Sequence, residues 1–200
     1  MKTDIILCGV GGQGILSIAT IIGEAAMNEN LYIKQAEVHG MSQRGGDVQS
    51  TLRISSQPIA SDLVPLGGAD VIISMEPMEA LRYLPYLKKD GWIVTSSVPF
   101  VNIPNYPDID DIQAELSTLN AQLSALDTTP HVLTLDIEQM AKDNAIPRSA
   151  NVILLGAAQQ TLGLAYEKLE EAIRSVFGRK GNAVVEANIK ALALGHASQK

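Results

Sequence analysis

A run of glycines near the start of the chain restricts the fold more than any other feature of the sequence. Residues 9–14 read G-V-G-G-Q-G, after an apolar run at 4–8 and before helically spaced apolar residues at 15–28. Glycine lets a backbone turn tightly, and a helix that follows it offers unpaired N–H groups and the positive end of its dipole. With a second apolar segment at 31–38, this pattern predicts the opening of a Rossmann-like α/β fold, a doubly wound and largely parallel sheet.

The remaining segments continue the alternation of strands and helices and then become wholly helical. Further strands are expected at 48–54, 69–74, 92–95 and 132–135, with helices at 77–87 and 108–126. C-terminal helices are expected from about residue 148, at 149–162, 166–177 and 182–194. We therefore expect a single domain over residues 1–200. The helix at 149–162 is apolar on most sides, which suits burial in its own core and contact with a partner equally well.

The glycine turn is the first candidate binding site. Gly9, Gly11 and Gly14 match the pattern G-x-G-x-x-G between a strand and a helix, and Gly12 and Gln13 complete the turn. Contact with an anion or a phosphate is the functional interpretation, because the helix that follows begins at the turn. The structural alternative is a tight turn that only packs the helix against the strand.

A second candidate is the loop within E-V-H-G-M-S-Q-R-G-G, residues 37–46. In a parallel sheet this loop leaves the carboxyl end of the second strand and lies beside the glycine turn. Arg44 would then supply a positive fork suited to a carboxylate or a phosphate, with Ser42, Gln43 and Gly45 beside it. A structural ion pair is the equally weighted alternative for Arg44.

Three further residues have both functional and structural interpretations. Glu37 stands where a dinucleotide site often has an acidic residue for the ribose, although a solvated strand end explains it too. His39 is interpreted as a hydrogen-bonded loop residue, because no candidate nucleophile is adjacent. Glu76 precedes Pro77 and is expected near a helix N-terminus, where a carboxylate is favoured. No catalytic residue is assigned.

The composition excludes several classes of site. The net charge of −7 and the pI near 4.9 argue against a nucleic-acid binder. Cys8 is the only cysteine, so the chain can form no internal disulfide and cannot hold an ordinary iron–sulfur cluster alone. The histidines at 39, 131 and 196 lack metal-ligand spacing, so no metal site is expected.

Apolar runs such as residues 152–158 are far shorter than the roughly 20 residues that span a bilayer. No membrane association is expected, and the absence of a signal-peptide pattern predicts a cytoplasmic location.

Four motifs together resemble one known family over nearly the whole chain. They are G-V-G-G-Q-G, E-V-H-G-M-S-Q-R-G-G, S-M-E-P-M-E-A-L-R and R-S-A-N-V-I-L-L-G-A, and the late V-V-E-A-N-I-K-A fits as well. The sequence resembles the gamma-type domain of 2-oxoacid:ferredoxin oxidoreductases, and within them the beta subunits of the indolepyruvate type. H-G-M-S-Q-R-G-G is far more specific than the glycine turn.

The resemblance implies a subunit of an enzyme that oxidatively decarboxylates a 2-oxoacid to an acyl-CoA and passes electrons to ferredoxin. It implies a large alpha subunit as partner, which carries thiamine diphosphate and 4Fe-4S clusters, with ferredoxin and CoA acting through the complex. No cofactor is expected in this chain, and indolepyruvate or another arylpyruvate is the expected substrate. The glycine turn and residues 42–46 are the segments expected to face the active centre.

Two other functions remain open at the level of sequence. The glycine pattern with Glu37 is compatible with an NAD-dependent oxidoreductase domain, although no substrate domain or catalytic pair accompanies it. A module that binds an anionic ligand is the third interpretation.

Overall fold

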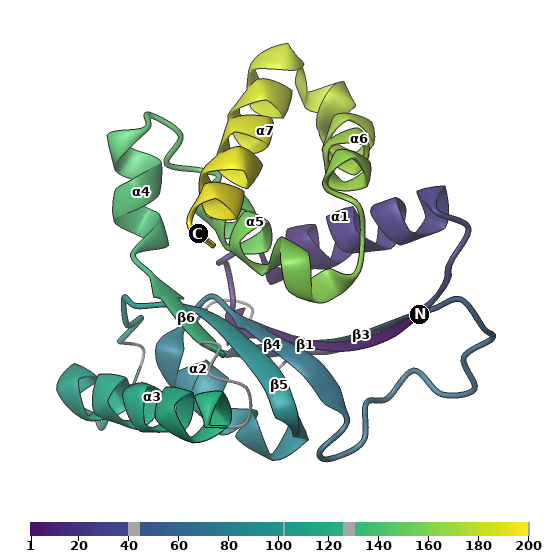
Figure 1. Cartoon of the computed structure of the whole chain (residues 1–200). Coiled ribbons are helices and arrows are strands. Elements are labelled where there is room, and N and C mark those ends of the chain that lie inside the picture. The colour runs from purple at the N-terminus through teal and green to yellow at the C-terminus, as the bar shows by residue number, and fades with distance from the viewer. Residues whose placement is uncertain (40–44, 102, 126–130, 200) are drawn as a thin grey trace.

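The computed structural model describes residues 1–39, 45–101, 103–125 and 131–199 and arranges them as one mixed sheet between helices (Figure 1). The sheet has six strands in the order β2-β3-β1-β4-β5-β6. The strands are β1 Lys2–Val10, β2 Tyr32–His39, β3 Asp47–Ser55, β4 Ala69–Ser74, β5 Leu87–Ser96 and β6 Val132–Leu135. The pairs β1–β4, β4–β5 and β5–β6 are parallel, which confirms the predicted largely parallel α/β sheet.

Helices cover both faces of the sheet, as a doubly wound fold requires (Figure 1). One face carries α1 Ile15–Asn28, α5 Ala150–Leu162, α6 Tyr166–Phe177 and α7 Asn182–Ala197, and α4 Ile137–Asp143 leads to that layer from β6. The other face carries α2 Pro77–Arg82 and α3 Ile109–Ser124. None of the helices described here is both long and apolar enough to traverse a membrane.

The position of β3 corrects the expected opening of the fold. β2, the strand after α1, runs in the same direction as β1, as the sequence predicted, but β3 lies between the two and is antiparallel to both. The short connection between His39 and Asp47 explains this, because a few residues join antiparallel neighbours, whereas parallel neighbours need a long crossover. Among the described strands, β3 alone therefore runs against the rest.

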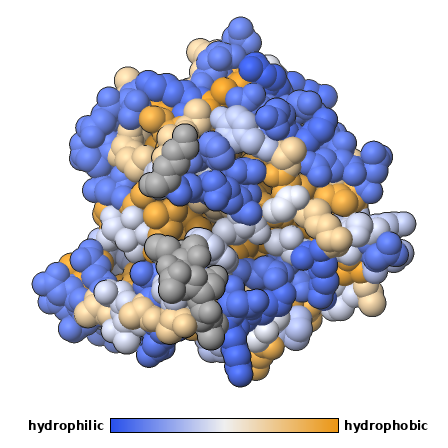
Figure 2. Space-filling view, in the orientation of Figure 1, coloured by the Kyte–Doolittle hydropathy of each residue, from blue (hydrophilic) through white to orange (hydrophobic). Residues whose placement is uncertain are grey.

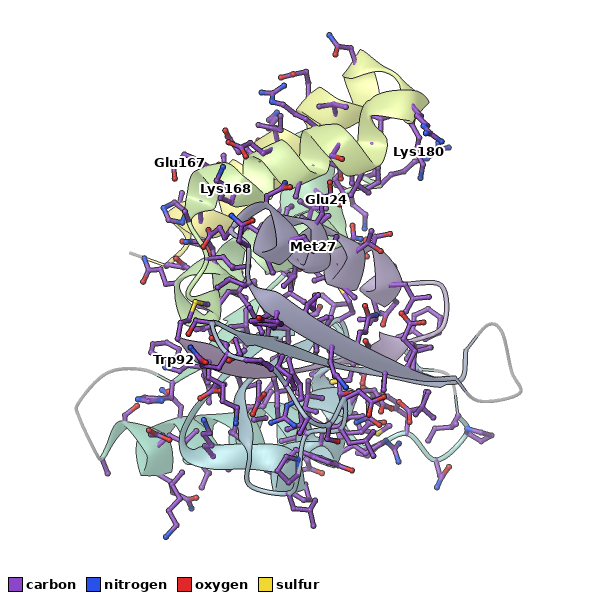
Figure 3. The ribbon with its side chains drawn as sticks, turned by 90° about the vertical axis from the view of Figure 1, so that its right-hand side faces the viewer. Glu24, Met27, Trp92, Glu167, Lys168 and Lys180 are labelled. Atoms are coloured by element: carbon purple, nitrogen blue, oxygen red, sulfur yellow. The ribbon has the colours of Figure 1, made fainter. Side chains whose placement is uncertain are left out.

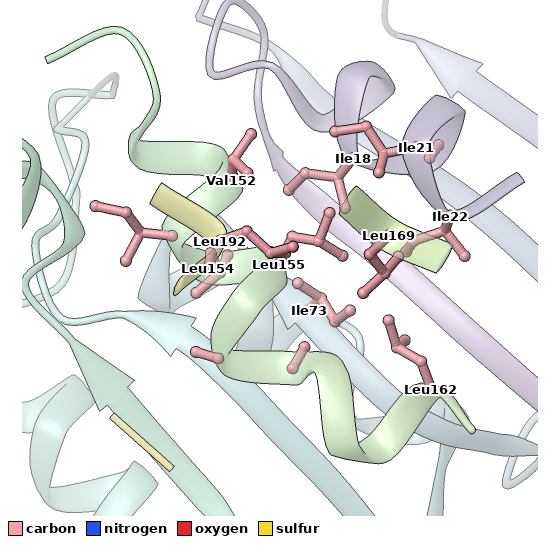
Figure 4. Close-up of a cluster of buried hydrophobic side chains, with 14 of the residues drawn as sticks. Ile18, Ile21, Ile22, Ile73, Val152, Leu154, Leu155, Leu162, Leu169 and Leu192 are labelled. Carbon is pink, nitrogen blue, oxygen red and sulfur yellow. The ribbon is translucent and has the colours of Figure 1, made fainter. Parts of the chain in front are cut away.

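The larger core lies between the sheet and the layer of α1, α5, α6 and α7 (Figure 4). Helix α5 is buried on nearly every side, and Val152, Ile153, Leu154 and Leu155 have no exposed surface. Of the two interpretations of this helix, burial in the chain's own core is therefore correct. The side chains labelled in Figure 4 are Ile18, Ile21, Ile22, Ile73, Val152, Leu154, Leu155, Leu162, Leu169 and Leu192.

A smaller core lies on the opposite face, where Ala80 of α2 packs with Ile93, Ile112 and Leu116. The helix expected at 77–87 is shorter than predicted, because it ends at Arg82 and a short 3₁₀ turn, Leu84–Tyr86, follows. Pro85 accounts for this, since proline has no N–H to donate and disfavours helix at the residue before it.

The outer surface is largely hydrophilic in the view of Figure 2, and hydrophobic residues show in the band between the helical layer and the sheet. This distribution agrees with a core that is formed by the apolar stripes of helices packed on a sheet.

Candidate functional site

The strand ends bring the two predicted loops together at one edge of the sheet. The carboxyl end of β1 and the amino end of β3 meet there, where Val10 pairs with Asp47. The Gly11 N–H donates to the Gly46 carbonyl at 2.8 Å, and the Gly45 N–H donates to the Gly11 carbonyl at 3.4 Å. The predicted neighbourhood of the loops is therefore found, although Ser42, Gln43 and Arg44 lie outside the described residues.

Gln13 closes the glycine turn from within. Its side-chain carbonyl accepts the Val10 N–H at 2.7 Å, and its side-chain amide donates to the Met75 carbonyl at 3.2 Å. A Cβ at Gly9 would lie 2.8 Å from the Gln13 carbonyl oxygen and 3.0 Å from the Met75 Cβ. Gly9 therefore permits a close contact that links the ends of β1 and β4.

The last glycine of the turn starts α1. Gly14 has φ 86°, a left-handed conformation that glycine adopts without strain, and no acidic residue lies in the first turn of the helix. Its carbonyl accepts a hydrogen bond from the Asn151 side-chain amide at 3.1 Å, which joins the turn to the start of α5. The backbone N–H groups at the start of α1 thus keep the positive end of the helix dipole near this junction. Anion binding by the turn stays a prediction.

Glu76 lies beside the same edge and has a structural role. It is fully buried and caps α2, where its carboxylate accepts the Glu79 N–H at 2.9 Å. The other carboxylate oxygen accepts hydrogen bonds from the Tyr106 hydroxyl and from the Phe100 N–H. The predicted position near a helix N-terminus is confirmed, and the same side chain also holds the segment between β5 and α3.

The Cys8 thiol is buried below the strand ends, in a cluster of polar side chains. Burial raises the pKa of the Cys8 thiol, whose sulfur lies 3.7 Å from the Glu79 carbonyl oxygen. Burial also raises the pKa of Glu79, although Arg82 donates to its carboxylate at 2.8 Å. The Tyr83 hydroxyl donates a hydrogen bond to Asp47 at 2.7 Å, and burial raises the pKa of Tyr83 as well. A neutral, enclosed thiol of this kind is a poor nucleophile.

The other candidate ligands are scattered. His131 hydrogen-bonds the Gly91 carbonyl and stacks on Trp92, whereas His196 contacts Tyr166. Among the residues that the structure describes, no three His, Cys, Asp or Glu side chains are grouped as a metal site.

Glu37 lies on β2, at the edge of the sheet, and accepts a hydrogen bond from Gln35 at 2.5 Å. Because β3 separates β2 from β1, Glu37 is not on the strand next to the glycine turn, where a dinucleotide fold places its ribose carboxylate. His39 is the last residue of β2 rather than a loop residue.

A pocket that the sequence did not predict opens on the other side of the glycine turn. It has a volume of about 570 Å³ and lies among the starts of α1, α5 and α7. Gly12 and Gly14 line it together with Arg148, Ser149 and Lys180, and we call it the helix-end pocket. The available signals were basic residues just before two helices, in R-S-A-N at 148–151 and G-R-K-G-N at 178–182.

Comparisons with known proteins agree over the full length. The family described as Pyruvate ferredoxin/flavodoxin oxidoreductase matches residues 4–198. The indolepyruvate oxidoreductase subunit IorB of Archaeoglobus fulgidus is 34% identical over 98% of this chain and 94% of its own length. That of Thermococcus kodakarensis is 36% identical over 96% and 93%. The 2-oxoglutarate synthase subunit KorC of Methanothermobacter marburgensis is 26% identical over 88% and 86%.

Solved structures share the fold. The gamma subunit of a keto/oxoacid ferredoxin oxidoreductase from Geobacter sulfurreducens aligns with a TM-score of 0.67 at 23% identity, over 98% of both chains. The 2-oxoglutarate:ferredoxin oxidoreductase of Magnetococcus marinus aligns with a TM-score of 0.72 at 21% identity, over 99% of this chain but only 31% of that longer chain. From its sequence, its sheet and these relatives, the chain belongs to the pyruvate ferredoxin/flavodoxin oxidoreductase family.

Proposed function

We propose that this chain is the small subunit of a 2-oxoacid:ferredoxin oxidoreductase that acts on an arylpyruvate such as indolepyruvate. The observation that carries the proposal is the identity of 34–36% with IorB subunits over nearly the full length of both chains. The corresponding subunit of a 2-oxoglutarate enzyme reaches 26%. This difference in sequence identity favours the indolepyruvate type among enzymes that share this fold.

The chemistry of this chain supports a division of labour with a large alpha subunit. An iron–sulfur cluster needs about four thiolates, whereas Cys8 is the only cysteine and is fully buried. We assign the clusters and thiamine diphosphate to the proposed partner, with ferredoxin and CoA acting through the complex. A ferredoxin-linked enzyme of this kind suits a reducing compartment, so we propose a cytoplasmic location.

Docking is the proposed role of this chain itself. We assign the glycine turn and the segment of Ser42, Gln43, Arg44 and Gly45 to the surface that faces the active centre of the complex. The hydrogen bonds between Gly11 and residues 45–46 support a common surface for the two segments. The burial of α5 removes the alternative in which that helix meets the partner.

Reconstitution with the large subunit tests the proposal. Ferredoxin reduction by indolepyruvate, with CoA present, is expected only when both chains are combined, and pyruvate and 2-oxoglutarate are expected to be poorer substrates. The isolated chain is expected to be colourless, with no stoichiometric iron or acid-labile sulfide. Full activity of the large subunit without this chain would contradict the docking role.

Calorimetric titration with NAD separates the proposal from the dinucleotide alternative. We expect no tight binding, because Gln13 fills the turn and β3 separates Glu37 from it. Micromolar NAD affinity without association to the large subunit would favour the alternative.

A further inference from the structure

We propose that the helix-end pocket binds the phosphate group of a small phosphate ester. The inference rests on the pocket alone and does not depend on the 2-oxoacid reaction. Its volume of about 570 Å³ lies within the range of sites that hold small organic ligands.

Three helices begin at the pocket and supply its polar floor. Helix α1 follows Gly14, α5 follows Ser149, and α7 follows Gly181, and the first residues of each helix or the residue before it line the pocket. None of the three has an acidic residue in its first turn. Their dipoles are therefore not neutralised at these ends, and their free N–H groups favour an anion.

Two cationic side chains face the same space from different loops. Arg148 precedes α5, and Lys180 extends from the turn between α6 and α7 (Figure 3). Neither forms an ion pair with a carboxylate among the residues that the structure describes, and Lys180 is held 5.1 Å above the centre of the Phe177 ring.

No Asp or Glu is among the described residues that line the pocket. The carboxylate of Glu24, which Figure 3 also labels, is near the far end of α1 and accepts a hydrogen bond from Ser175 at 2.8 Å. The pocket is thus positive in a protein whose net charge is −7.

Ser149 provides independent evidence for a ligand. Its side chain lines the pocket, the residue is 3% exposed, and it stands at the N-cap position of α5. A serine there normally accepts a hydrogen bond from the first turn of its helix, but Ser149 makes no such bond and has no other side-chain partner among the described residues. Its hydroxyl opens onto the pocket, where a ligand oxygen would supply the hydrogen bond that no described residue makes.

The remaining wall indicates the rest of the ligand. Ile146, Pro147, Phe177 and Val184 are apolar and stand next to the cationic groups. Apolar surface beside a few convergent polar groups is typical of sites that hold an organic body by contact and an anionic head by charge. Three helix N-termini with an arginine and a lysine favour the doubly charged phosphate over a carboxylate.

Isothermal titration of the full chain tests the inference with three probes at matched ionic strength: phenyl phosphate, inorganic phosphate and benzoate. Phenyl phosphate is expected to bind most tightly and benzoate most weakly. Saturable binding of phenyl phosphate would support the site. Equal or tighter binding of benzoate would overturn the assignment to phosphate, and no saturable binding of any probe would overturn the site.

Arg148→Gln and Lys180→Gln are each expected to weaken phenyl phosphate binding by about tenfold. Arg179→Gln is the matched control, because Arg179 is the exposed neighbour of Lys180, lies outside the pocket lining and carries the same charge. It is expected to change the affinity by less than about twofold. If Arg179→Gln lost as much affinity for phenyl phosphate as Lys180→Gln, the binding would reflect a diffuse basic surface, and the proposal would be overturned.

Ser149→Ala tests the buried hydroxyl. Because Ser149 does not cap α5, the variant is expected to keep its thermal stability and to lose affinity for phenyl phosphate. A variant that loses stability and keeps its affinity would contradict the role given to this side chain.

Discussion

Gly156 of α5 and Gly195 of α7 lie where the backbones of the two helices meet. A Cβ on Gly156 would be 2.2 Å from the Leu192 carbonyl oxygen, and one on Gly195 would be 1.8 Å from the Ile153 carbonyl oxygen. Both obstacles are backbone atoms of a neighbouring helix, so no side-chain rotation relieves either clash. The close approach of α5 to α7 therefore depends on these two glycines.

Gly195→Ala is expected to destabilise the protein by about 3 kcal/mol or more, since the helices must separate to admit the methyl group. Urea denaturation followed by circular dichroism measures the loss. Gly178→Ala is the control, because a Cβ there meets nothing within 4 Å and its φ is −53°. Similar stabilities for the two variants would contradict the packing described.

Asp4 gives the stability an acid dependence. Burial on its own would raise the pKa of Asp4, but the paired hydrogen bonds from Arg53, at 2.7 and 3.0 Å, and a contact with Lys2 hold it below its ordinary value of 3.8. A lowered folded-state pKa stabilises the protein above about pH 4, and this contribution is lost as the pH falls through the folded-state pKa.

Asp4→Asn is expected to cost about 3 kcal/mol at pH 7, because it leaves the largely buried Arg53 guanidinium without its carboxylate. The difference from the unmodified protein is expected to shrink below about pH 4 in urea denaturation series. Asp90→Asn, at an exposed position, is the control and is expected to have little effect at either pH. A loss for Asp4→Asn that did not vary with pH would rule out the charge as its cause.

Glu76→Gln is expected to cost about 1–3 kcal/mol, because one of the two oxygens that accept hydrogen bonds is replaced by a donor in a buried site. The segment that carries Phe100 and Tyr106 is expected to become more sensitive to limited proteolysis. Glu115→Gln, at an exposed position on α3, serves as the control. Unchanged proteolysis would show that the carboxylate does not hold this segment.

The chain is expected to unfold in one cooperative transition, in keeping with the prediction of a single domain over residues 1–200. The large core joins residues from β1 to α7, so the C-terminal helices share their apolar contacts with the first strand and helix. Calorimetry provides the measurement. Two resolved transitions, with the helices from about residue 148 melting separately, would contradict it.

Arg44→Ala is expected to reduce the activity of the reconstituted enzyme and to leave the melting temperature of the isolated chain unchanged. A loop arginine assigned to the docking edge contributes little to the core. A lowered melting temperature would instead support the alternative of a structural ion pair.

The sequence predicted most elements because their signals are local. Alternating and helically spaced apolar residues mark the strands and the long helices within a few positions. The missed helix, α4, follows Asp136, whose carboxylate accepts the Gln139 N–H at 2.8 Å, and this N-cap pattern was present in the sequence. The place of β3 was not predicted, because apolar periodicity identifies a strand but not its neighbours in the sheet.

The candidate site likewise was predictable only where the sequence signals are local. The neighbourhood of Gly11 and residues 45–46 was predictable, because both lie beside strand ends at one edge of the sheet. The helix-end pocket was not predictable, because Arg148 and Lys180 line a common pocket with the glycine turn only after the C-terminal helices pack over α1. Contacts between segments so distant in sequence leave no periodic signal.

The order of the strands has a consequence for synthesis of the chain. Of the six strands β1 is synthesised first, and its neighbours in the sheet are β3 and β4, so one of its edges stays unpaired until Ser55 has been made and the other until Ser74. During that interval a strand whose Ile5, Ile6 and Leu7 become fully buried in the folded protein is exposed to other chains. We expect the nascent chain to be most prone to aggregation, and most in need of a chaperone, until β4 has emerged.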